Sequence, residues 1–250
     1  MVENAAVKTA SGAKLNFARL FLLVLFLSLA LVFWDSRLLL PLKLLVVMMH
    51  ETGHALATLL VGGTVQKVTI TLSQSGACLS YLPPGWAAKV LVYSAGYLGS
   101  ALAGGALMLA TFRFRASRAV LAALCLWLLV MAAFYAGDPF TLGFCVATAL
   151  ALGLGAKLLP ASAVDLVNLF LAAFSSLYVL FDLREGLWNP VARAHSDAAL
   201  LASLTFIPQL VWAGVWTLLA ILLLALFAWR SVRVAKEKGF SMRRSLGTIP

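Results

Sequence analysis

Three ionisable side chains lie within one helical turn near the middle of the second apolar run of the chain: His50, Glu51 and His54. Two histidines four residues apart face the same side of an α-helix, about 6 Å apart along its axis. Both imidazoles can therefore reach one zinc ion with bonds of about 2.0–2.1 Å. Glu51 lies about 100° around the helix from His50. It can therefore act as a general base on a zinc-bound water molecule instead of binding the metal.

This His-Glu-x-x-His spacing is a specific signal in a chain with so few ionisable residues. The sequence holds three histidines and four glutamates among 250 residues. Random placement would produce the motif in roughly one such chain in two thousand. Ionisable groups inside an apolar span also cost several kcal/mol unless they have a function. The competing interpretation is a pair of hydrogen-bonded core histidines beside a paired glutamate.

A catalytic zinc ion usually has three protein ligands and one open position, so a third ligand is needed. Asp197 is the first candidate, because it opens a short apolar stretch that we expect to form a half-helix at membrane depth. This half-helix should begin near Ser196 or His195. Asp182, which follows a long apolar segment, and His195 remain alternative third ligands.

The composition indicates an integral membrane protein. Hydrophobic residues make up 63% of the chain and charged residues only 11%, whereas soluble domains carry about 25% charged residues. The net charge of +10 does not indicate nucleic-acid binding. The basic residues stand at the ends of apolar runs, at Arg113, Arg115, Arg118 and 230–244, as in the cytoplasmic loops of membrane proteins. We expect one membrane-embedded domain over 1–250, with a core of about 37–229 and a basic tail at 230–250.

The hydropathy pattern predicts an all-α polytopic protein with about six to seven transmembrane helices. In hydrocarbon each backbone N–H and C=O needs an internal partner, so every long apolar run should be helical. The first run is too long for the core of a cleaved signal peptide, and we interpret it as a retained span. The apolar segments are 16–34, 37–61, 86–111, 118–136, 140–158, 163–182 and 208–229.

Two stretches interrupt this pattern. Residues 64–82 alternate polar and apolar side chains and are rich in β-branched residues, which predicts a short β-hairpin at the membrane surface. Residues 183–207 contain several charged and polar side chains, followed by apolar residues from Ser196 to Thr205. That apolar run is too short to span a bilayer, so we expect a re-entrant half-helix packed inside the bundle.

The third apolar run contains small residues at helical spacing. Ala95 and Gly99, and then Ser100 and Gly104, form small-xxx-small pairs that let a neighbouring helix approach closely. Helix packing alone explains such pairs. The functional alternative places this face against the helix that carries His50, with room left for the backbone of a substrate.

The segments His50-Glu-Thr-Gly-His-Ala-Leu-Ala57 and Ser94-Ala-Gly-Tyr-Leu-Gly99, with Gly62-Gly63 between them, resemble the site-2 protease group of intramembrane zinc metallopeptidases. Ser196-Asp-Ala198, leading to Ile207-Pro208, is similar to a compact bacterial branch of that group. Better-known members carry their aspartate before glycine, whereas here it precedes alanine.

The resemblance implies one Zn²⁺ per chain, bound by His50, His54 and Asp197, with Glu51 as the base. It also implies transmembrane helices as substrates, cut in or near the lipid bilayer, and a multi-pass protein of a bacterial cytoplasmic membrane. We therefore predict an intramembrane zinc metalloprotease. One alternative is a non-catalytic membrane scaffold or chaperone derived from such an enzyme. A metal transporter is less favoured, because the sequence shows no internal repeat.

Overall fold

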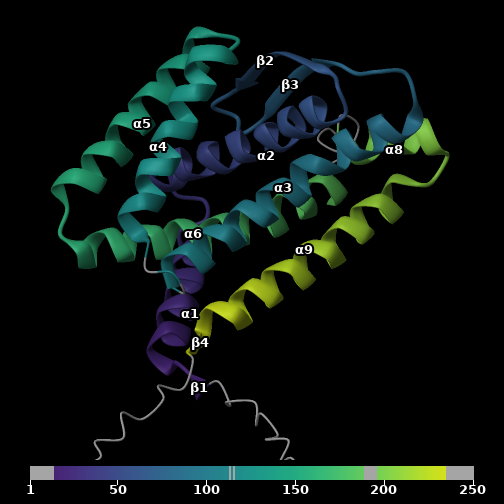
Figure 1. Cartoon of the computed structure of the whole chain (residues 1–250). Helices are drawn as coiled ribbons and strands as arrows, with labels where there is room; N and C mark the ends of the chain where they lie inside the picture. The colour runs from purple at the N-terminus through teal and green to yellow at the C-terminus, as the bar shows by residue number, and fades with distance from the viewer. Residues whose placement is uncertain (1–13, 113, 115, 189–195, 235–250) are drawn as a thin grey trace, which may run out of the picture.

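The computed structural model describes residues 14–112, 114, 116–188 and 196–234 (Figure 1). Each of the seven predicted apolar segments forms a helix, as their backbone hydrogen-bonding needs require. An additional short helix follows the polar interruption at 183–195. The helices are α1 (Phe17–Val32), α2 (Leu40–Leu60, preceded by the 3₁₀ turn η1, Arg37–Leu39), α3 (Trp86–Phe112), α4 (Ser117–Phe134), α5 (Pro139–Leu158), α6 (Ala161–Trp188), α8 (Asp197–Thr205) and α9 (Gln209–Val232).

The number of membrane spans is lower than the number of long helices. Within the described residues, α3, α4, α5, α9 and the Ala161–Asp182 part of α6 are long and apolar enough to cross a membrane. α1 and α2 together could supply a sixth span, but the chain bends by 119° between them. α1 has 16 residues, and at about 1.5 Å per residue it is shorter than a ~30 Å hydrocarbon layer. Seven separate spans are therefore one more than the structure supports.

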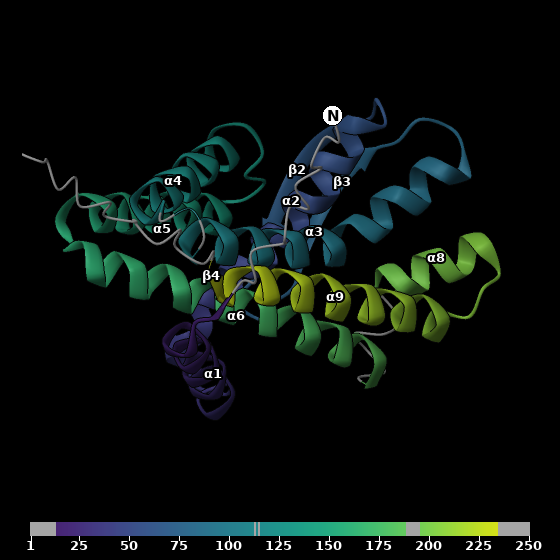
Figure 2. The same cartoon turned by 60° about the horizontal axis from the view of Figure 1, so that its bottom comes forward.

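α3 is the central helix, since it contacts α2, α4, α6, α8 and α9. The α4–α5 pair lies to one side of α2 and α3, and α8 with the adjoining end of α9 lies to the other (Figures 1 and 2). The apolar window of α6 is 61% buried, whereas that of α5 is only 17% buried. The outer faces expose leucines such as Leu150, Leu218 and Leu222. Such a surface suits lipid, which needs no polar covering, and the chain is an integral multi-pass membrane protein.

The predicted hairpin is confirmed as β2 (Thr64–Ile70) and β3 (Gly76–Tyr81), an antiparallel pair that follows α2. The outer edge of β2 is held by the loop between α4 and α5. Val68 N–H donates to Tyr135 O at 2.6 Å, and Gly137 N–H donates to Val68 O at 2.8 Å. Beyond that loop, the Asp138 side chain caps α5 by accepting from Thr141 N–H.

The predicted half-helix is also present, as the nine-residue α8. Its N-cap is Ser196, whose hydroxyl accepts from the Ala199 N–H. α8 packs against α3 and α9, and Ala198 and Leu201 are buried. α6 extends past the predicted end at residue 182 as far as Trp188. His195, the other proposed cap, lies outside the described residues.

The two ends of the described chain meet at one end of the bundle. β1 (Lys14–Leu15) pairs antiparallel with β4 (Arg233–Val234), where α1 begins and α9 ends (Figure 1). The Asn16 N–H donates to Val232 O at 2.9 Å, and the Arg19 guanidinium donates to Ser231 O at 3.2 Å. The first and last long helices are thus fastened to each other.

Candidate metal centre and active site

Two helices bring three of the predicted site residues together. His50 and His54 come from consecutive turns of α2, and Asp197 is the first residue of α8, 143 positions after His54. The two Nε2 atoms are 3.0 Å apart, and Asp197 Oδ2 lies 3.2 Å from each of them. The three side chains are the one group in the described chain whose atoms are close enough to hold a single metal ion. Asp197 was the preferred third ligand from the sequence, and the structure places it here.

This triangle fits three ligands of a tetrahedral zinc ion. Bonds of about 2.0–2.1 Å at tetrahedral angles separate ligand atoms by about 3.3–3.4 Å. The separations of 3.0, 3.2 and 3.2 Å differ from that value by a few tenths of an ångström. Two imidazole nitrogens and a carboxylate oxygen are also common zinc ligands. The residues present can therefore hold a zinc ion.

The hydrogen bond of His54 fixes which of its nitrogens faces the triangle. His54 Nδ1 lies 2.7 Å from the carbonyl oxygen of Val92 on α3. Because a carbonyl can only accept, Nδ1 carries the hydrogen and Nε2 keeps its lone pair. A ligating histidine is usually oriented in this way by a partner on its second nitrogen.

His50 is held by different contacts. Its ring packs edge-to-face on the Tyr97 ring, with centroids 4.7 Å apart. Its Nδ1 lies 3.7 Å from Asp182 Oδ2 on α6. Asp182, the alternative third ligand, thus faces the nitrogen on the far side of the ring and is not part of the triangle.

The first pair of small residues of α3, Ala95 and Gly99, packs closely against α2, whereas Gly104 of the second pair packs against α6. A Cβ added at Gly53 would collide with the carbonyl oxygen of Ala95 and lie 3.0 Å from its carbonyl carbon. A Cβ added at Gly99 would lie 3.1 Å from the Cα of Gly53. Only hydrogen atoms at these positions let the two backbones touch.

Gly96 has a more direct relation to the site. A Cβ at this position would collide with His50 Nε2 and lie 2.5 Å from His54 Nε2. The missing side chain therefore leaves the space that the two imidazoles occupy. The sequence signal was the small-residue stretch itself, which indicated close packing but did not single out Gly96.

Glu51 is buried beside the triangle and is not one of its three members. Its carboxylate is covered by the hairpin: a Cβ added at Gly76, the first residue of β3, would lie 2.5 Å from Glu51 Oε1. Burial raises the pKa of the nearby Cys78 thiol to about 11, so the thiol stays protonated at neutral pH. The hairpin thus forms one wall of the site.

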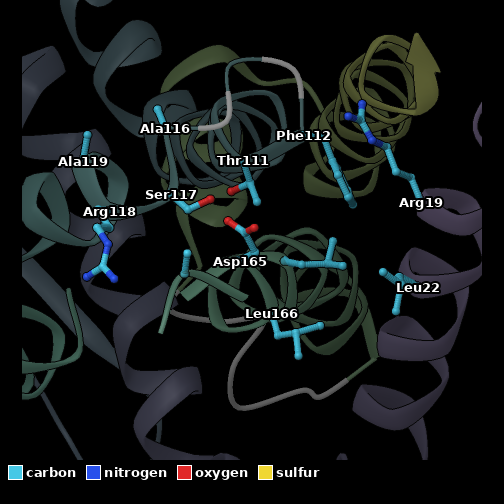
Figure 3. Close-up of a pocket in the computed structure, with 12 residues that line it drawn as sticks. Arg19, Leu22, Thr111, Phe112, Ala116, Ser117, Arg118, Ala119, Asp165 and Leu166 are labelled. Carbon is cyan, nitrogen blue, oxygen red and sulfur yellow. The ribbon is translucent and has the colours of Figure 1, made fainter. Parts of the chain in front are cut away.

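A cavity in the described part of the chain lies away from this site. It has a volume of about 670 Å³ and is lined by the start of α1, the end of α3 and the starts of α4 and α6. Figure 3 shows Asp165, Ser117 and Thr111 near its centre, while Arg19 and Arg118 lie at opposite sides. None of the four predicted site residues lines it. Asp165 lies near the start of α6, whereas Asp182, which faces His50, lies 17 residues further along the same helix.

Comparison with sequence models of protein families gives a match. The sequence model of the Peptidase M50B-like family matches residues 22–227, which include both α2 and α8. Searches of curated proteins and of solved structures give no match. The match covers far more than half of the chain. The chain belongs to the Peptidase M50B-like family, the site-2 protease family.

Proposed function

We propose that this protein is an intramembrane zinc metalloprotease that hydrolyses peptide bonds of membrane-spanning substrates. The observation that carries the proposal is the triangle of His50, His54 and Asp197, built on apolar helices of a membrane protein. These residues would hold one zinc ion per chain. The whole chain is proposed to act as a single membrane-embedded peptidase domain, and a bacterial cytoplasmic membrane is its proposed location.

Within this site, zinc supplies a Lewis acid for amide hydrolysis. Glu51 takes a proton from the attacking water and then passes it to the leaving amine. Its burial under Gly76 of the hairpin keeps bulk water away from the carboxylate. The contacts of His54 with Val92 and of His50 with Tyr97 hold the two rings in place. Positioning of this kind accounts for a large part of enzymatic rate enhancement.

The exposed edge of β3 supports an extended substrate segment as the ligand. In the described chain β3 pairs with β2 alone. Val68 directs its N–H and C=O toward the α4–α5 loop, and it stands opposite Cys78 in the register. In an antiparallel pair such a residue belongs to a non-hydrogen-bonded position, so the Cys78 N–H and C=O also point away from β2. An unwound substrate backbone can therefore add to this edge, next to Glu51.

Removing the metal tests the proposed function. Full-length protein in liposomes with a single-span substrate is expected to cleave it, to stop when a chelator has removed the zinc, and to recover when zinc is returned. The measurements are cleavage by gel mobility and zinc by atomic absorption on the same samples. Cleavage that continues after the zinc has gone would contradict a zinc-dependent mechanism.

A proline on the edge of β3 tests the substrate-binding step. Cys78→Pro removes an outward N–H and leaves the hydrogen bonds to β2 in place, because proline is tolerated on edge strands. We expect KM to rise about 2- to 10-fold, the equivalent of one hydrogen bond, with little change in zinc content. Cys78→Ala is the matched control, since it removes the same thiol but keeps the N–H. Equal KM values for the two variants would show that β3 does not pair with the substrate.

A further inference from the structure

His50 has one nitrogen in the triangle and one outside it. Nε2 faces His54 Nε2 at 3.0 Å and Asp197 Oδ2 at 3.2 Å. Nδ1 is buried and has no hydrogen-bond partner within the described residues. If Nε2 offers its lone pair to a cation, a neutral ring must carry its hydrogen on Nδ1. A buried N–H of this kind requires an acceptor.

Asp182 is placed to be that acceptor. Its Oδ2 lies 3.7 Å from His50 Nδ1, about 0.9 Å beyond the length of a charge-assisted N–H···O hydrogen bond. The His50 ring itself has little freedom to move, because Tyr97 packs against it and the backbone of Gly96 lies directly beside its Nε2. The Asp182 side chain is 33% exposed, whereas the His50 side chain is 13% exposed. A small rotation of this carboxylate would close the gap.

We propose that Asp182 is a positioning residue that accepts the Nδ1–H of His50 and thereby orients His50 toward the metal. The inference rests on the proposed function and deepens it. It gives the two histidines matching arrangements, in which His54 donates to the Val92 carbonyl and His50 donates to a carboxylate. It also explains why α6 carries an aspartate at the end of its apolar window instead of another apolar residue.

Zinc affinity of the purified full-length protein in detergent tests this role without relying on activity. We measure zinc dissociation constants by competition with a chromophoric chelator for wild type and for Asp182→Ala, Asp182→Asn and Asp182→Glu. Loss of a partner of this type weakens metal binding by about 10- to 100-fold, and we expect this for the alanine variant. Asparagine retains a neutral acceptor and should lose less, and glutamate should restore most of the affinity. All variants should still reach one zinc per chain at saturation.

Asp165→Ala is the matched control, because Asp165 lies on the same helix and lines the distant cavity. Its zinc affinity should equal that of wild type. Equal affinity of Asp182→Ala and wild type would overturn the positioning role while leaving the metal site intact. Failure of Asp182→Ala to bind zinc even at saturation would also overturn it, since Asp182 would then be a ligand. Absence of zinc binding in folded wild-type protein would overturn the proposed function and this inference together.

Discussion

Glu51→Gln is expected to reduce cleavage of a membrane-spanning substrate by about 10²- to 10⁴-fold, the usual contribution of a general base. Zinc content should remain near one per chain, because Glu51 is not part of the triangle. Glutamine has nearly the same size and shape as glutamate, so the contact with Gly76 and the packing of the hairpin are preserved. What is lost is the ability to accept a proton from water.

This prediction is measured with purified protein in liposomes, by the initial rate of cleavage and by zinc analysis of the same preparation. Asp165→Asn is the matched control, because it makes the same carboxylate-to-amide change away from the site, and its rate should equal that of wild type. If the chain acts in cells and Glu51→Gln leaves that action unchanged, the non-catalytic scaffold becomes the better explanation. The same result would remove Glu51 from the proposed mechanism.

Asp197→Ala is expected to abolish stoichiometric zinc binding. Asp197 is the one carboxylate in the triangle, and its removal leaves only two imidazoles, 3.0 Å apart. Loss of a partner that touches only a ligand already costs about 10- to 100-fold in affinity, so loss of a direct ligand should cost more. Cleavage should disappear with the metal.

Atomic absorption on detergent-purified protein measures this effect as zinc per chain. Wild type should hold close to one zinc, His50→Ala should lose it like Asp197→Ala, and Asp165→Ala should keep it. Gel filtration and circular dichroism establish that each variant is folded. Zinc retained without Asp197 would move the third ligand elsewhere, with Asp182 and His195 as the next candidates.

The two variants have different signatures, and together they separate binding from catalysis. Glu51→Gln keeps the metal and loses the reaction, whereas Asp197→Ala loses both. A transporter that used the same histidines would depend on Asp197 but would not require a general base at Glu51. Cleavage and zinc content measured side by side therefore distinguish these functions.

The sequence alone was sufficient for features that depend on neighbouring residues. Apolar runs predict helices because hydrocarbon leaves the backbone no other hydrogen-bond partners. The alternation at 64–82 predicted the hairpin, and the small polar Ser196 predicted the start of α8. The spacing of His50 and His54 placed both rings on one face of α2, since four residues make about one helical turn.

Other features depended on contacts between helices that are far apart in the chain. The sequence marks a break between the segments 16–34 and 37–61, but the 119° bend there, which reduces the number of spans, is seen only in the structure. Gly76 covers Glu51 only because the hairpin folds back over α2. The sequence placed Asp182 at the end of an apolar segment, but α6 continues past it to Trp188, and its carboxylate lies 3.7 Å from His50 Nδ1.

For this protein, the sequence by itself determined the class of protein, the helices, the hairpin and the histidine pair. Each of these follows from interactions between residues close in the chain, or from the lack of hydrogen-bond partners in lipid. Only the tertiary structure decided which carboxylate completes the triangle, and it brought Asp197 to two histidines more than 140 residues away. The physical reason is that α3 packs against both α2 and α8, and glycines at its contact with α2 set how closely α3 can approach the two histidines.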